Sequence, residues 1–208
     1  MAGIGSPELD GPLPKPAVTN NPPENTLESE PRKHRPPYKI QSAKEFGPVK
    51  WRGHCLCGKV SYVLKRDKPL ESKYCHCRVC QVNHGAPFQW AFIIYKHEMS
   101  FLTGAHGVSR YETPHESQMY GPHTKVSCSS CHTPIMDECE NVCLIFPQLI
   151  EITGSNGEQR KQREVFKPKC HVFYESRMED ILDGLPKWRE IDGTSGLLDD
   201  YGNQIPNR

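Results

Sequence analysis

The sequence predicts a mostly β domain of short antiparallel strands, preceded by a tail that does not fold. One observation is that short segments alternate apolar and polar residues, as where Val60, Tyr62 and Leu64 share one face of residues 59–66. A second is that no segment carries a long apolar repeat of 3.6 residues, which is the pattern of an amphipathic helix. A third is the count of ten cysteines, most of them in clusters.

The chain divides by composition into a tail, a domain and a short extension. Residues 1–45 are rich in proline, with few apolar residues and no periodicity, so they cannot bury enough surface to offset the entropy of ordering. We therefore expect a disordered tail over 1–45, a domain over 46–190 and a C-terminal extension over 191–208. The basic run at 31–37 fits a solvated linker, with targeting or anion binding as the alternative.

Within the domain, residues 89–96 are apolar on both faces, which predicts a central strand covered on both sides. The best helix candidate is short: it begins at Ser176, where Glu179 completes a capping-box pattern, and ends at Gly184. The other strand candidates are 59–66, 98–104, 107–113, 125–128, 134–139, 142–146 and 169–175.

Charge and hydropathy exclude several functions. The net charge of +1 provides no general field for nucleic acid, so nucleic-acid binding is not expected. No apolar run approaches the roughly 18 residues that span a membrane, and the N-terminus lacks the pattern of a secretory signal. A cytoplasmic setting is expected, with a nuclear one as the alternative. In such a reducing compartment, clustered cysteines indicate metal binding or catalysis rather than disulfides.

Two cysteine pairs predict a structural zinc site. Cys55 and Cys57 are two residues apart, so both side chains fall on one side of an extended backbone. Cys128 and Cys131 have the C-x-x-C spacing of a zinc knuckle. The two pairs together supply the four thiolates of a tetrahedral site. The alternative is a set of free core thiols or another pairing.

The third cluster, Cys75, Cys77 and Cys80, is left with three thiolates. Three protein ligands and one exchangeable position are the arrangement of catalytic zinc. Three anionic sulfurs make the metal less electrophilic than a zinc held by three histidines. This favours binding a substrate thiolate over generating hydroxide. The alternative is a closed site with a histidine as fourth ligand, and the candidates are His76, His84, His132 and His171.

The remaining cysteines, Cys139, Cys143 and Cys170, are expected to be small apolar core residues. No P-loop, nucleophile elbow or dinucleotide fingerprint is present.

The ordered motifs, G-x-C-x-C-G at 53–58, C-H-C-x-x-C at 75–80 and C-x-x-C at 128–131, resemble the glutathione-dependent formaldehyde-activating enzyme family, which shares its domain with centromere protein V. The resemblance covers roughly residues 50–190 and departs from the family pattern at Ser127 and His132, where an aromatic residue and a glycine are usual. It implies a β-tent fold with two zinc ions per chain. It also implies carbon–sulfur lyase chemistry, in which glutathione and formaldehyde combine to give S-(hydroxymethyl)glutathione.

The leading hypothesis is therefore an enzyme whose thiol substrate, such as glutathione, occupies the open position of the Cys75, Cys77 and Cys80 zinc and attacks an aldehyde. His171 or His84 is expected to carry the proton. Cations are expected to hold the substrate carboxylates, and the candidates are Arg78, Lys96, Arg110 and Arg177. One alternative is an enzyme of the same fold that acts on a different specialised metabolite. The other is a non-catalytic, zinc-stabilised interaction module.

Overall fold

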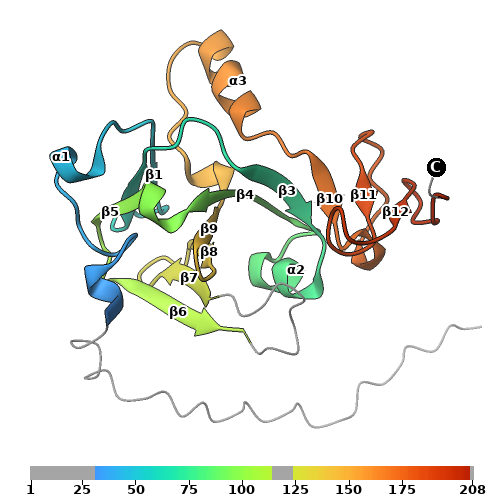
Figure 1. Cartoon of the computed structure of the whole chain (residues 1–208), viewed down its shortest axis with the longest axis horizontal. Coiled ribbons are helices and arrows are strands. Elements are labelled where there is room, and N and C mark those ends of the chain that lie inside the picture. The colour runs from blue at the N-terminus through green and yellow to red at the C-terminus, as the bar shows by residue number, and fades with distance from the viewer. Residues whose placement is uncertain (1–30, 114–123, 207–208) are drawn as a thin grey trace, which may run out of the picture. The chain divides into compact units, whose positions relative to one another are not determined.

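The computed structural model describes residues 31–113 and 124–206, so the disorder expected over residues 1–30 lies outside the described part (Figure 1). The described residues form twelve strands, which confirms the mostly β prediction. The strands are β1 (Trp51–His54), β2 (Ser61–Leu64), β3 (Glu71–Cys75), β4 (Gln89–Tyr95), β5 (Met99–Thr103), β6 (Val108–Glu112), β7 (Thr124–Cys128), β8 (Pro134–Glu138), β9 (Val142–Ile145), β10 (Cys170–Val172), β11 (Lys187–Trp188) and β12 (Leu197–Leu198).

The strands form two sheets. The smaller sheet has the order β1-β2-β5, and the larger has the order β12-β11-β10-β3-β4-β9-β8-β7-β6. All pairings are antiparallel except those of β10, which runs parallel to both β3 and β11. Because β10 returns from a distant part of the chain, it brings residues 170–172 directly beside residues 73–75 at the end of β3.

The core contains residues of both sheets. Val60, Tyr62 and Leu64 are all buried, as their alternation predicts. In the larger sheet, β4 occupies the centre, and Phe92 and Ile94 belong to the same buried cluster as Tyr62. The prediction of a central strand over 89–96 is therefore confirmed.

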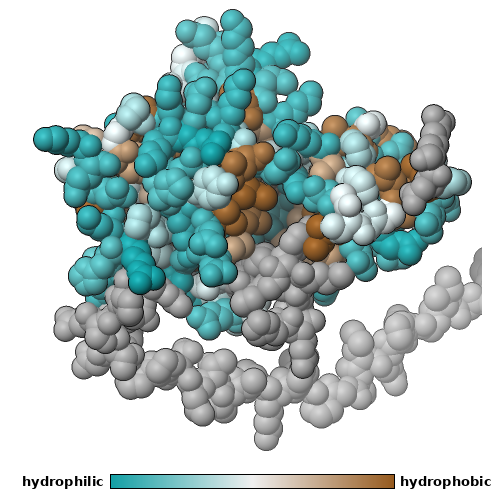
Figure 2. All heavy atoms as spheres, viewed as in Figure 1, coloured by the Kyte–Doolittle hydropathy of each residue, from teal (hydrophilic) through white to brown (hydrophobic). Residues whose placement is uncertain are grey.

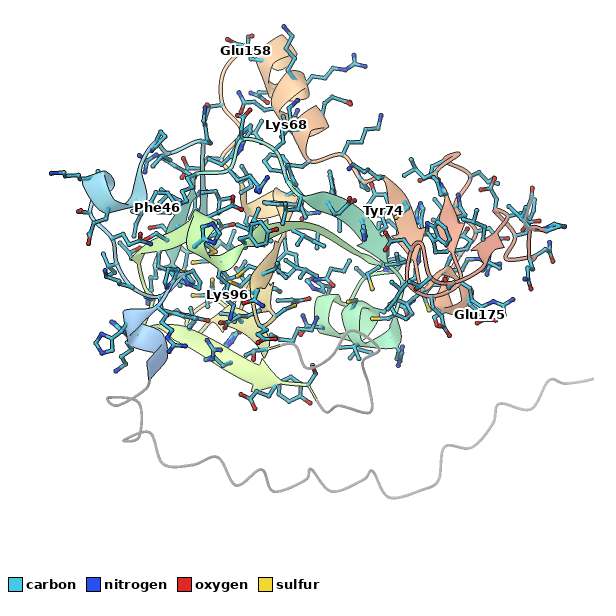
Figure 3. All side chains as sticks on the ribbon, in the orientation of Figure 1. Phe46, Lys68, Tyr74, Lys96, Glu158 and Glu175 are labelled. Atoms are coloured by element: carbon cyan, nitrogen blue, oxygen red, sulfur yellow. The ribbon has the colours of Figure 1, made fainter. Side chains whose placement is uncertain are left out.

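In the described part of the chain, three α-helices and four short 3-10 helices accompany the strands: α1 (Ala43–Phe46), α2 (Arg78–His84), α3 (Asn156–Val165), η2 (Pro31–His34), η3 (Lys96–Glu98), η5 (Pro147–Leu149) and η6 (Tyr174–Ser176). The longest helix, α3, buries no residue, and hydrophilic side chains cover it in Figure 2. An apolar repeat could not reveal α3, because it has no buried face. Its capping box, Ser155 with Glu158, was the available signal (Figure 3). Among the described residues, no helix combines the length and apolar character that crossing a membrane requires.

The helix expected from Ser176 to Gly184 is wrong. Only the 3-10 turn Tyr174–Ser176 forms there, and the following residues are irregular. Tertiary hydrogen bonds compete with the helix: the Tyr174 hydroxyl accepts from the Ile181 amide at 2.8 Å, and the Asp183 carboxylate binds His171 at 2.8 Å. These contacts hold residues 181–183 against β10 in a non-helical path.

The packed part of the chain begins before residue 46, where the sequence placed the domain start. Tyr38 and Phe46 are both buried. The Tyr38 ring stacks on Phe101 of β5 at 5.4 Å, and its hydroxyl donates a 2.7 Å hydrogen bond to Glu138 of β8. Residues 38–46 are thus part of the packed domain, although their composition resembles that of the preceding tail.

Replacing Tyr38 should measure this contribution. Tyr38→Ala should lower the free energy of unfolding by about 3 kcal/mol, because it removes a buried ring. Tyr38→Phe keeps the ring but loses the hydrogen bond donated to Glu138 and the one accepted from Arg110, so it should cost about 2 kcal/mol. Chemical denaturation of both variants provides the measurement. The exposed Tyr201→Ala is the control, with an expected change below about 0.5 kcal/mol. An equally small change for Tyr38→Ala would show that residues 38–46 do not contribute to the stability of the domain.

Candidate metal centres

Four cysteines from two different sheets meet at one point. Cys55 and Cys57 lie in the turn after β1, Cys128 ends β7, and Cys131 lies in the turn before β8. Their sulfur atoms all lie within 4.8 Å of one another. The Sγ atoms of Cys55 and Cys57 are 3.5 Å apart, and those of Cys57 and Cys128 are 3.9 Å apart.

These separations fit a zinc ion. Zinc–sulfur bonds of roughly 2.3 Å in a tetrahedron place neighbouring sulfurs about 3.8 Å apart. None of the four cysteines forms a disulfide. The two turns also bind each other, since the Leu56 amide donates to the Thr133 hydroxyl at 3.2 Å. The two pairs that the sequence matched are therefore brought together with the spacing that zinc requires.

His132 departs from ideal backbone geometry at this site. Its φ is 56°, in the left-handed region where glycine is the favoured residue. Its amide donates to the carbonyl of Cys128 at 2.9 Å, which closes the C-x-x-C turn. The glycine expected here from the family pattern thus has a physical reason, and this chain builds the same turn with a histidine under strain.

The second cluster is local in sequence. Cys75 ends β3, Cys77 is the N-cap residue of α2, and Cys80 lies in the first turn of that helix. The three sulfur atoms lie within 4.8 Å of one another. The Cys80 amide donates to the Cys77 sulfur at 3.5 Å, so the helix start itself directs two sulfurs to one point.

The three thiols cannot all ionise without a cation. Hydrogen bonds from Cys75 and Cys80 lower the pKa of Cys77 well below its usual range. The contact with Cys77 raises the pKa of Cys75, and the contacts with Cys75 and Cys77 raise the pKa of Cys80, so the three thiols oppose one another's ionisation. Removing the other two protons requires a positive ion between the sulfurs, and a zinc ion fits this requirement.

Within the described ranges, no histidine or carboxylate joins Cys75, Cys77 and Cys80. The His76 ring instead binds His171, with Nε2 of His76 2.8 Å from Nδ1 of His171. His84 packs edge-on against Phe146 at 4.8 Å, and His132 belongs to the four-cysteine site. None of the four histidines considered from the sequence closes the second site.

His171 forms part of a buried chain behind this cluster. Its Nε2 lies 2.8 Å from Asp183, and its ring packs against Tyr74, the β3 residue labelled in Figure 3. Burial raises the pKa of Asp183, but hydrogen bonds from His171 and Lys187 outweigh this effect and hold it at about 2. Because a carboxylate only accepts, His171 carries its proton on Nε2 and accepts at Nδ1 from His76. In this geometry, His171 supports His76, the residue between Cys75 and Cys77. A catalytic role for His171 stays a prediction.

The four cations expected to hold substrate carboxylates do not all gather in one place. Lys96 and Arg110 both pair with Glu138, at 2.7 and 2.6 Å. Arg177 pairs with Asp180 at 2.7 Å, and Arg78 is exposed at the start of α2. The carboxylates therefore neutralise three of the four.

Polar residues that the sequence analysis missed connect to Cys80. The Cys80 sulfur lies 2.5 Å from the side-chain oxygen of Gln89. The side-chain amide of Gln89 donates to Oδ2 of Asp137 at 2.9 Å, and Lys125 donates to the same oxygen at 2.6 Å. Lys125 and Asp137 face each other in the register of β7 and β8. The sequence signal was two charges inside otherwise apolar strands, but only the register pairs them.

Comparison with known proteins places this geometry in a family. Residues 50–176 match the family described as glutathione-dependent formaldehyde-activating enzyme. A comparison with curated proteins finds no match. A solved Rhodobacter sphaeroides protein is similar at 14% identity and a TM-score of 0.40, over 51% of this chain and 93% of that one. Since the family match spans more than half of the sequence, the chain belongs to the glutathione-dependent formaldehyde-activating enzyme family.

Proposed function

We propose that this chain is a zinc-dependent, carbon–sulfur lyase-type enzyme that joins a thiol to an aldehyde, as in the formation of S-(hydroxymethyl)glutathione from glutathione and formaldehyde. The observation that carries the proposal is the contrast between the two clusters. One has four sulfurs and the other has three, with no further histidine or carboxylate beside it in the described residues. Membership of the formaldehyde-activating family supports the reaction class.

The two sites have different tasks in this proposal. Zinc held by Cys55, Cys57, Cys128 and Cys131 is structural, because its ligands come from both sheets and close a loop of the chain from residue 57 to residue 128. Zinc held by Cys75, Cys77 and Cys80 keeps one position for substrate, where it would lower the pKa of a bound thiol.

The chain's own residues orient the reacting groups. The N-cap of α2 and the pairing of β3 with β10 hold Cys75, Cys77 and Cys80 in fixed positions. A substrate sulfur bound beside them would meet the aldehyde carbon at close range, so alignment rather than a strong base lowers the barrier.

A steady-state assay with glutathione and formaldehyde tests the reaction. The purified protein should form S-(hydroxymethyl)glutathione faster than the spontaneous reaction, and Cys77→Ser should remove the acceleration. Cys139→Ser is the matched control, because Cys139 is outside both cysteine clusters. A wild-type rate equal to the spontaneous one rules out this pair of substrates. It directs attention to another small thiol or carbonyl metabolite, or to a binding module.

Metal content and stability should separate the two sites. Cys128→Ser should abolish cooperative unfolding or strongly lower Tm, because a structural zinc contributes on the order of 10 kcal/mol to folding. Cys77→Ser should lose one zinc while keeping a folded domain, because its ligands span only residues 75–80. Elemental analysis and thermal unfolding provide the two readings. An equal decrease in Tm in both variants would contradict the division into a structural and a catalytic zinc site.

A further inference from the structure

A small cavity lies between strands β6, β7 and β8 of the larger sheet and Asn83 of α2, the helix that also carries Cys80. Its volume is about 200 Å³, and the residues around it include Asn83, Arg110, Tyr111, Lys125, His132 and Asp137. This is less than the 300–1,000 Å³ or so that enclose a drug-sized ligand. The cavity therefore suits the reacting end of a substrate rather than a whole tripeptide.

Two residues around the cavity carry buried polar atoms that have no hydrogen-bond partner in the described part of the chain. They are Oδ1 of Asp137, an acceptor, and Nε of Arg110, a donor. Asp137 is only 1% exposed. A buried polar atom left unpaired costs about 1–3 kcal/mol, which a ligand recovers when it supplies the missing partner. One acceptor and one donor around a small space match a hydroxyl or carbonyl oxygen and its proton.

Lys125 supplies the charge at this cavity. It is 6% exposed, and its ammonium group lies 2.6 Å from Oδ2 of Asp137. Burial lowers the pKa of Lys125, but the charge of Asp137 and its hydrogen bond outweigh this and raise the pKa, so the side chain is an ammonium ion. Three successive side-chain contacts, of 2.5, 2.9 and 2.6 Å, connect the Cys80 sulfur to Lys125 through Gln89 and Asp137.

We infer that Lys125 is the catalytic acid on the oxygen side of the reaction, and that Asp137 and Gln89 are positioning residues that hold it beside the three-cysteine site. The inference rests on the proposed function and extends it. The ligand class is a small aldehyde, whose oxygen lies in the cavity as its carbon meets the substrate sulfur.

The step balances without an oxidant or a reductant. The substrate thiol loses its proton, and its sulfur forms a bond to the aldehyde carbon. The π electron pair of the carbonyl moves to oxygen, which takes a proton from Nζ of Lys125. The proton released by the thiol restores the ammonium. Asp137 exchanges no proton in this step, and its Oδ1 accepts a hydrogen bond from the new hydroxyl.

Neutralising the pair tests the inference. Lys125→Met alone would leave Asp137 as a buried charge without its partner, so the test variant is Lys125→Met with Asp137→Asn. It should fold, hold two zinc ions and keep its KM for glutathione within about 3-fold, whereas kcat should fall at least 10²-fold, as for the loss of a general acid. Glutathione binding is read independently in the cobalt-substituted protein, from the change that added glutathione produces in the thiolate-to-cobalt absorption band. This change should be the same in the variant and the wild type.

A second variant and a control keep the test decisive. Lys125→Arg keeps the positive charge, so the domain should fold, but arginine does not release its proton, so kcat should still fall. Lys73→Met is the matched control, since Lys73 also pairs with a carboxylate, Asp192 at 2.6 Å, and is not among the residues around the cavity. A wild-type kcat in either Lys125 variant would overturn this inference and leave the proposed function standing. A wild-type protein without activity would overturn the proposed function and this inference with it.

Discussion

Sulfur atoms brought within 4.8 Å of one another are the constraint on which the rest of this structure depends. Thiolates at that distance repel each other unless a cation lies between them, and the spacing of the four-cysteine set fits zinc. That set joins the turn after β1 to the end of β7, so it connects the small sheet to the large one. The apolar core continues across the same junction, because Cys55 and Cys128 are themselves buried in it.

The three-cysteine set depends on a different kind of support. Its ligands are close in sequence, so their geometry is decided by local structure: a strand end, a helix N-cap and one helical turn. Behind it, β10 contributes His171 to a buried chain that runs from His76 to Asp183. Asp183 follows the part of the chain that the family match covers, and it is held by Lys187 at 3.0 Å. The C-terminal residues thus support the candidate site through hydrogen bonds and packing, and they supply none of its three cysteine ligands.

The sequence predicted best where the pattern and the physics were both local. The alternation of Val60, Tyr62 and Leu64 located a strand and its buried face. The sequence did not predict α3, because that helix has no buried face and so no apolar repeat. It wrongly predicted a helix over residues 176–184, where Tyr174 and Asp183 make tertiary hydrogen bonds in place of helical ones. It also placed the domain start too late, because Tyr38 is one aromatic residue in a proline-rich segment and its partners lie far along the chain.

The cysteine spacings by themselves determined which neighbouring sulfurs point the same way, because C-x-C and C-x-x-C spacings restrict where two nearby side chains can point. They predicted a set of four and a set of three, and the tertiary structure brings the pair at 55 and 57 to the pair at 128 and 131. Only the tertiary structure decided what surrounds those sets. The register of β7 against β8 places Lys125 opposite Asp137, and Gln89 on β4 connects that pair to Cys80. Strand register depends on contacts between distant segments, and no local pattern in the sequence contains that information.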